Sequence, residues 1–190
     1  MKTVVSVALA LAVTTAGSAA FALEPAFTAG KLNAGAQLQY GIDMEDTETT
    51  PYGLGFGLVG GYTLDMNVYI GGRFEYFFGS SDEVAGADVS FSLWQLQVEG
   101  GYDLGIISAL VVRPQLGLGM AGYSGEVCID DLAGQSCSDP SETAFALTPG
   151  VSALYDVKPV FLSLTLRYNA AMIEETATAL FIGVGAGMTF

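Results

Sequence analysis

From residue 31 to residue 44 the sequence alternates between apolar and polar residues at every position. The apolar positions are Leu32, Ala34, Ala36, Leu38, Tyr40, Ile42 and Met44. Successive side chains of a β-strand point to opposite faces, so a period of two predicts a strand with one apolar and one polar face. The pattern recurs along the chain and predicts eight strands, over residues 31–44, 52–64, 68–78, 89–102, 110–123, 143–155, 160–172 and 177–190.

One of these strands changes phase. Within residues 89–102, Phe91 and Leu93 lie at odd positions, whereas Trp94 and Leu96 lie at even positions. One extra residue in a strand shifts the alternation in this way, so we expect a β-bulge there.

The N-terminus has the features of a secretion signal. Lys2 gives a positive start, residues 4–13 form an apolar core, and Ala20-Phe21-Ala22 fits a small-x-small cleavage site. We therefore expect residues 1–22 to be a cleaved signal peptide and residues 23–190 to form one domain.

The chain is 51% hydrophobic, yet its apolar residues are interleaved with polar ones. A membrane-spanning helix needs about 20 consecutive apolar residues, and the sequence after the signal has no such run. Strands that turn every second side chain toward lipid have this interleaved pattern. An exported chain with eight such strands is predicted to be all-β, as an eight-stranded antiparallel up-and-down transmembrane β-barrel.

The polar face of the predicted strands is rich in Gly, Gln, Ser, Thr and Asn and has few charges. A water-exposed face normally carries many charged residues, so this face suits a confined interior. Its charged residues are Arg73, Glu75, Glu99, Arg113 and Arg167, at similar predicted depths. We expect an interior ion-pair network with Glu99 between Arg73 and Arg113, which would plug the barrel. The alternative is a narrow gated pore with a glycine-rich wall.

The apolar face is rich in Leu, Val, Ile and Phe, and we expect it to contact lipid. Aromatic residues near the predicted strand ends would form girdles at the membrane surfaces. They are Tyr40, Tyr52, Tyr62, Tyr76, Trp94, Tyr102, Tyr155 and Tyr168.

The connections alternate in length. Those after the second, fourth and sixth strands are short, and those after the first, third and fifth are longer and acidic. This predicts periplasmic turns on one side and extracellular loops on the other, with both termini periplasmic. The loops hold 13 of the 20 acidic residues and no Lys or Arg. We interpret them as a solvated surface; the alternative is a site for divalent cations or for a basic extracellular partner.

Two cysteines, Cys128 and Cys137, lie in the longest predicted loop, residues 124–142. Exported proteins meet an oxidising compartment, so we expect a disulfide between them. A metal site is not expected, because the chain has no other Cys and no His.

Composition argues against two functional classes. The net charge of −14 does not suit nucleic-acid binding, which depends on basic patches. The chain has no His, and no Ser or Asp has an activating partner at a suggestive spacing, so we expect neither an enzyme nor a cofactor.

The C-terminal segment, residues 183–190, ends in Phe190 and includes Gly185. With the eight-strand pattern, it makes the chain resemble the small outer-membrane barrels of the OmpA, OmpX and OmpW type. The resemblance implies that Gly185, Met188 and Phe190 form the signal read by the barrel-assembly machinery, with Met188 in place of the usual aromatic residue.

The resemblance also implies a Gram-negative outer membrane, contact with its lipid and lipopolysaccharide, and help from periplasmic chaperones during biogenesis. Members of this superfamily differ in function. We expect a structural or adhesin-like surface role, with a narrow passive pore for small or apolar solutes as the alternative.

Overall fold

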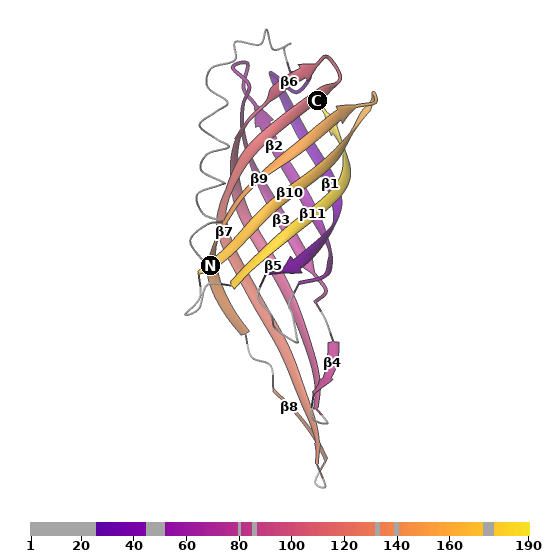
Figure 1. Ribbon diagram of the computed structural model, residues 1–190, viewed down its shortest axis with the longest axis vertical. Coiled ribbons are helices and arrows are strands. Elements are labelled where there is room, and N and C mark those ends of the chain that lie inside the picture. Colours follow the sequence, from indigo (N-terminus) through magenta and orange to yellow (C-terminus); the bar gives the residue numbers. More distant parts are fainter. Residues whose placement is uncertain are drawn as a thin grey trace.

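Eight long antiparallel strands close into a barrel (Figure 1). The computed structural model describes residues 26–44, 52–79, 81–84, 87–131, 134–138, 141–172 and 177–190. The wall consists of β1 (Lys31–Asp43), β2 (Leu54–Thr63), β3 (Val68–Phe77), β5 (Ala87–Tyr102), β7 (Leu110–Asp131), β9 (Ser141–Asp156), β10 (Val160–Met172) and β11 (Ala177–Thr189). Each strand pairs with the next one in the wall, and β1 pairs with β11 to close the ring. The eight-stranded up-and-down barrel predicted from the alternation is confirmed.

Within the described part of the chain, no helix is long and apolar enough to cross a membrane.

The two ends of the barrel differ. One end, here called the terminus end, holds Lys31 and Phe190. At the other end, here called the hairpin end, β5 and β7 continue beyond the barrel and pair with each other (Figure 1). There β5 also pairs with β4 (Ser81–Val84), and β7 also pairs with β8 (Gly134–Ser138).

The prediction of loops over residues 79–88 and 124–142 was therefore wrong in part. Each contains an additional short strand, because β4 pairs with β5 and β8 pairs with β7. The strands continue because β-branched Val127 and Ile129 alternate there, while the polar residues on either side of them resembled a loop. At the terminus end, the short connection predicted between residues 102 and 110 contains the short strand β6 (Leu104–Ile107).

The expected β-bulge in β5 was also wrong, because its pairing with β3 and β7 runs without a register shift. Leu93 is fully buried and points into the barrel, whereas Leu96 is 58% exposed on the outer wall. The phase change in the sequence thus reflects an apolar layer inside the hairpin end.

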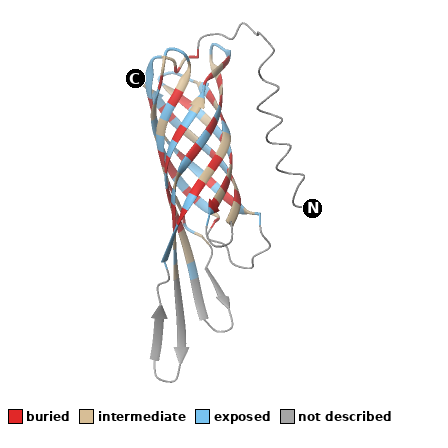
Figure 2. Ribbon diagram, turned by 90° about the vertical axis from the view of Figure 1, so that its left-hand side faces the viewer, coloured by how far each residue is buried: buried red, intermediate tan, exposed pale blue. Residues whose placement is uncertain are grey.

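Inward and outward residues alternate along the strands of the wall (Figure 2). On the outer face, Leu38 is 62% exposed and Leu164 is 56% exposed, as expected of residues that contact lipid. The predicted girdle residues Tyr40, Tyr62, Tyr102 and Tyr155 are exposed, and Tyr76, Trp94 and Tyr168 are half-buried.

Tyr52 is an exception among the predicted girdle residues, because it is buried inside the barrel. It precedes Gly53, whose φ of 132° lies in a region that residues with a side chain rarely adopt. The strand β2 begins only at Leu54, so the alternation does not extend back to Tyr52.

Both ends of the interior are apolar. At the hairpin end, Tyr52, Phe77, Leu93, Ala121, Ala146, Ala179 and Phe181 pack together. The ring centroids of Phe77 and Phe181 are 4.6 Å apart. At the terminus end, Ala26 packs on Val111, Leu154 and Phe161. Polar and charged residues fill the space between these two clusters.

Candidate functional site

Four buried charged side chains meet in the middle of the barrel. Arg73 and Glu75 lie two residues apart on β3, so both point inward, and Glu99 lies on the neighbouring β5. Arg73 Nε is 2.5 Å from Glu99 Oε1, and Arg73 Nη1 is 3.8 Å from Glu75 Oε1. Arg167 comes from β10 on the opposite wall, where it contacts Glu75 and lies 4.0 Å from Glu99 Oε1. These four residues are called the central ion-pair group below.

The central ion-pair group is almost fully removed from solvent. The exposed fraction is 4% for Arg73, 0% for Glu75, 2% for Glu99 and 1% for Arg167. Isolated charges in such a place would be strongly unfavourable, whereas two cations facing two anions offset one another. The pairing ties β3 and β5 to β10 across the lumen.

Amide and hydroxyl side chains surround this group. Gln37 Nε2 donates to Glu75 Oε1 at 3.2 Å and to Gln39 Oε1 at 2.9 Å, and Arg167 donates to the same Gln39 oxygen. Gln97 Nε2 donates to Thr148 Oγ1 at 2.6 Å. The sequence pattern placed these residues on the polar face but did not identify them as partners of the charges.

Arg113 does not belong to the central ion-pair group, so its expected position beside Glu99 was wrong. It forms an ion pair with Asp103 at the terminus end, with 2.5 Å between Arg113 Nε and Asp103 Oδ1. Sequence reasoning placed Asp103 in a turn and missed it as a site residue. A signal was present, because Asp103 continues the inward alternation of residues 97, 99 and 101 on β5.

Asp103 also holds the segment that precedes β1. Its Oδ2 accepts hydrogen bonds from Thr28 at 2.5 Å and from Thr63 at 3.1 Å. The turn at residues 26–30 is further bonded to the wall through Gly30 N and Thr63 O, 2.9 Å apart. This turn and its apolar contacts therefore occupy the mouth of the barrel at the terminus end.

Inward glycines make room for large interior side chains. A Cβ atom at Gly61 would lie 2.5 Å from Tyr69 Cε2, and one at Gly71 would overlap the Tyr69 hydroxyl. The Tyr69 ring is thereby free to stack on Arg113, whose guanidinium carbon lies 3.7 Å from the ring centroid. A Cβ at Gly150 would overlap Arg167.

The described residues contain no cluster of three or more His, Cys, Asp or Glu side chains that could hold a metal ion. The buried charges face one another, so the arrangement can brace the wall and obstruct the lumen.

Three other predicted features lie elsewhere. In the backbone register of β7 and β8, Cys128 lies directly opposite Cys137, but a disulfide between them is not shown and stays a prediction.

Met188 and Phe190 face outward, 42% and 67% exposed, and Phe190 N donates to Leu32 O at 2.8 Å. Gly185 lies against Gln37 inside the barrel. The expected signal peptide, residues 1–22, lies outside the described residues.

A family comparison agrees with this barrel. The profile described as outer membrane protein beta-barrel domain matches residues 6–190. The chain belongs to the outer-membrane β-barrel family. The expected resemblance and the transmembrane character of the barrel are thereby confirmed. No curated protein matches the sequence.

Solved structures of other outer-membrane barrels share the fold. The attachment invasion locus protein Ail of Yersinia pestis is 15% identical with a TM-score of 0.53, covering 84% of this chain and 97% of Ail. Neisserial surface protein A (NspA) is 19% identical with a TM-score of 0.57, covering 84% and 96%. A major outer membrane protein of Thermus thermophilus is 14% identical with a TM-score of 0.59, covering 83% and 99%. At these identities the similarity concerns the fold alone.

Proposed function

We propose that this protein is a non-enzymatic, non-conducting barrel with a structural or surface-interaction role in a Gram-negative outer membrane. The main support is the central ion-pair group, in which Arg167 reaches from β10 to Glu75 and Glu99 on the opposite side of the lumen. The apolar cluster at the hairpin end and the turn at residues 26–30 obstruct the lumen further. A solute would have to displace the central ion-pair group, the apolar cluster and the turn.

The competing function is a narrow pore. Conductance of the purified wild-type barrel in planar lipid bilayers separates the two, and we expect no steady single-channel current. Arg167→Ala removes the side chain that crosses the lumen and tests whether this side chain affects the ion selectivity of any current. A stable wild-type channel whose ion selectivity changes in Arg167→Ala would replace the structural proposal with the pore.

In the proposed orientation the termini are periplasmic and the hairpin end is extracellular. The predicted loop segments, residues 45–51, 79–88, 124–142 and 174–176, carry acidic residues and no Lys or Arg. Ail has been solved with the heparin analogue sucrose octasulfate, a polyanion. Like charges repel, so a polyanion would be a poor ligand for this chain and a basic partner a better one.

Whole cells that display the protein provide the test of the surface role. We expect salt-sensitive binding of a fluorescent oligolysine peptide and no binding of sucrose octasulfate. The control replaces residues 126–139 by a two-residue turn, which shortens the β7–β8 hairpin and leaves the membrane barrel intact. Equal oligolysine binding by both proteins, measured at equal surface amounts, would remove this hairpin from the proposal.

The proposal includes the route to the membrane. Residues 1–22 would direct export and be removed, leaving residues 23–190 as one barrel domain. Periplasmic chaperones and the barrel-assembly machinery would then deliver the chain, with Gly185, Met188 and Phe190 as the assembly signal. The outward apolar side chains would contact outer-membrane lipid and lipopolysaccharide.

A further inference from the structure

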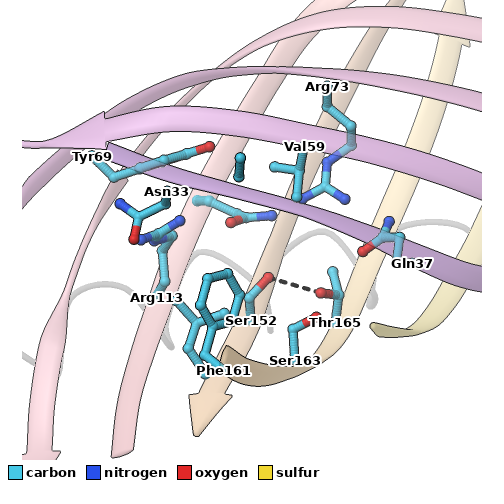
Figure 3. Close-up of a pocket in the computed structure, with 13 residues that line it drawn as sticks. Asn33, Gln37, Val59, Tyr69, Arg73, Arg113, Ser152, Phe161, Ser163 and Thr165 are labelled. Carbon is cyan, nitrogen blue, oxygen red and sulfur yellow. Dashed lines mark hydrogen bonds between the residues drawn. The ribbon is translucent and has the colours of Figure 1, made fainter. Parts of the chain in front are cut away.

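A small cavity lies inside the barrel between the central ion-pair group and the Arg113–Asp103 pair. Figure 3 shows Arg73 on one side of this space and Tyr69 and Arg113 on the other. The cavity offers about 20 Å³ to the centre of a water molecule. A cavity of about 10–15 Å³ is enough to hold a water molecule, so this cavity has room for a ligand of that size.

Four polar atoms from the lining side chains have no hydrogen-bond partner within the described part of the chain. They are Asn33 Oδ1, Tyr69 Oη, Arg73 Nη1 and Gln115 Nε2. Their residues are 4%, 1%, 4% and 7% exposed, so bulk solvent does not satisfy them. Buried polar atoms are rarely left unpaired, and four around one cavity point to a bound molecule.

The partners of Asn33 decide what kind of molecule fits. Asn33 Nδ2 donates to Lys31 O at 3.2 Å and to Thr63 Oγ1 at 3.1 Å, which fixes the amide with its oxygen as the free atom. That oxygen needs a donor, and a halide ion has none. Arg73 Nη1 and Gln115 Nε2 need an acceptor, and a metal cation has none.

The charges also favour a neutral ligand. Arg73 is paired with Glu99, and Arg113 is paired with Asp103, so neither cation requires a further anion. We propose that the cavity is a binding site for one water molecule that accepts hydrogen bonds from Arg73 and Gln115 and donates to Asn33 and Tyr69. Two donors and two acceptors on the protein match the hydrogen-bonding capacity of water.

This water would be a structural element of the wall. Its four partners lie on β1, β3 and β7, which are not all neighbours in the barrel. It would connect Arg73 of the central ion-pair group to Tyr69, the ring on which Arg113 stacks. The inference stands independently of the proposed surface role.

Crystals of the wild-type barrel grown with sodium bromide test the site, with diffraction recorded at the bromine absorption edge. We expect one peak of water density in the cavity and no anomalous signal there. Bromide in the cavity would assign the site to an anion and overturn the proposal. A cavity without density in a high-resolution map would also overturn it.

Substitution of Val59, which lines the cavity, gives a matched pair of variants. Val59→Leu adds a methylene group and should displace the water, whereas Val59→Thr keeps the volume and should retain it. We expect the urea midpoint of unfolding in lipid to be lower for Val59→Leu than for Val59→Thr, because the four polar atoms lose their partner. Water density that persists in Val59→Leu, or equal midpoints, would contradict the proposed site.

Discussion

Arg167 and Glu75 form an ion pair from opposite walls of the barrel, with both side chains almost completely buried. The contact joins β10 to β3, which lie half-way around the ring from each other. Neighbouring strands are already held by backbone hydrogen bonds. The ion pair adds a connection that the β-sheet itself does not provide, through the middle of the lumen.

Glu99 should contribute strongly to stability, because it accepts two hydrogen bonds from Arg73. Removing one partner of a buried ion pair commonly costs about 3–5 kcal/mol. We expect a loss of this size in the free energy of unfolding for Glu99→Ala and a smaller loss for Glu99→Gln, measured by urea titration in lipid vesicles. Glu142→Ala, which removes an exposed acid, is the control and should change little. Equal stability of Glu99→Ala and wild type would show that the pair is energetically unimportant.

Asp103 should control the turn at residues 26–30. Asp103→Asn weakens the pair with Arg113 and the hydrogen bond from Thr28, so the turn should leave the mouth more often. We expect faster trypsin cleavage after Lys31 in this variant. Glu142→Gln, an exposed change at the hairpin end, should leave the cleavage rate unchanged. If both variants are cleaved at the wild-type rate, Asp103 does not hold the turn.

The lipid-facing assignment can be tested at two adjacent residues of β10. Leu164 is 56% exposed and Thr165 is 3% exposed. The two native cysteines are first removed by Cys128→Ser and Cys137→Ser. In that background, the variants Leu164→Cys and Thr165→Cys should differ in labelling. A lipid-soluble maleimide in vesicles should label position 164 alone, and similar labelling of both would refute the assignment.

Phe190 should matter more for assembly than for stability, because its side chain is exposed. Phe190→Ala keeps the backbone bonds to Leu32, so the unfolding free energy in detergent should change little. The amount of barrel in the outer membrane should fall several-fold more than for Leu38→Ala, an outward control elsewhere on the wall. Equal membrane levels of the two variants would exclude an assembly role for the Phe190 side chain.

A disulfide between Cys128 and Cys137 should pin the β7–β8 hairpin. Closing a short ring contributes about 2–3 kcal/mol in the chain-entropy estimate. Cys128→Ser with Cys137→Ser should therefore leave the barrel folded and make the hairpin easier to cleave by protease. Mass spectrometry of oxidised, purified wild type checks the bond, and two free thiols would disprove it.

The barrel was predictable because lipid imposes a strict alternation on each strand. Where that constraint ends, prediction became less accurate. Residues 125–131 continue β7 beyond the barrel, yet their polar character suggested a loop. Leu93 and Phe181 point inward at an apolar end of the lumen, so residue type no longer distinguished the two faces.

The sequence predicted which charged residues lie inside the barrel, but not which of them form ion pairs. Alternation placed Arg73, Glu75 and Glu99 inside, and their proximity follows from the neighbouring strands β3 and β5. The contacts of Arg167 depend on the curvature that brings β10 across the lumen, which no local pattern encodes. Arg113 pairs with Asp103 because both lie near the terminus end, and the strand registers determine those depths.

The seam between β1 and β11 has a consequence for how the molecule folds. The wall begins with β1 and closes with β11, which lie near opposite ends of the sequence, and the seam includes the backbone bonds between Leu32 and Phe190. Contacts between such distant segments form slowly. Until β11 has been made and has joined β1, the growing sheet has two open edges that could pair with other chains. The ring can therefore close only after synthesis has reached its final strand, so the time before closure is the time when the two edges are open to other chains.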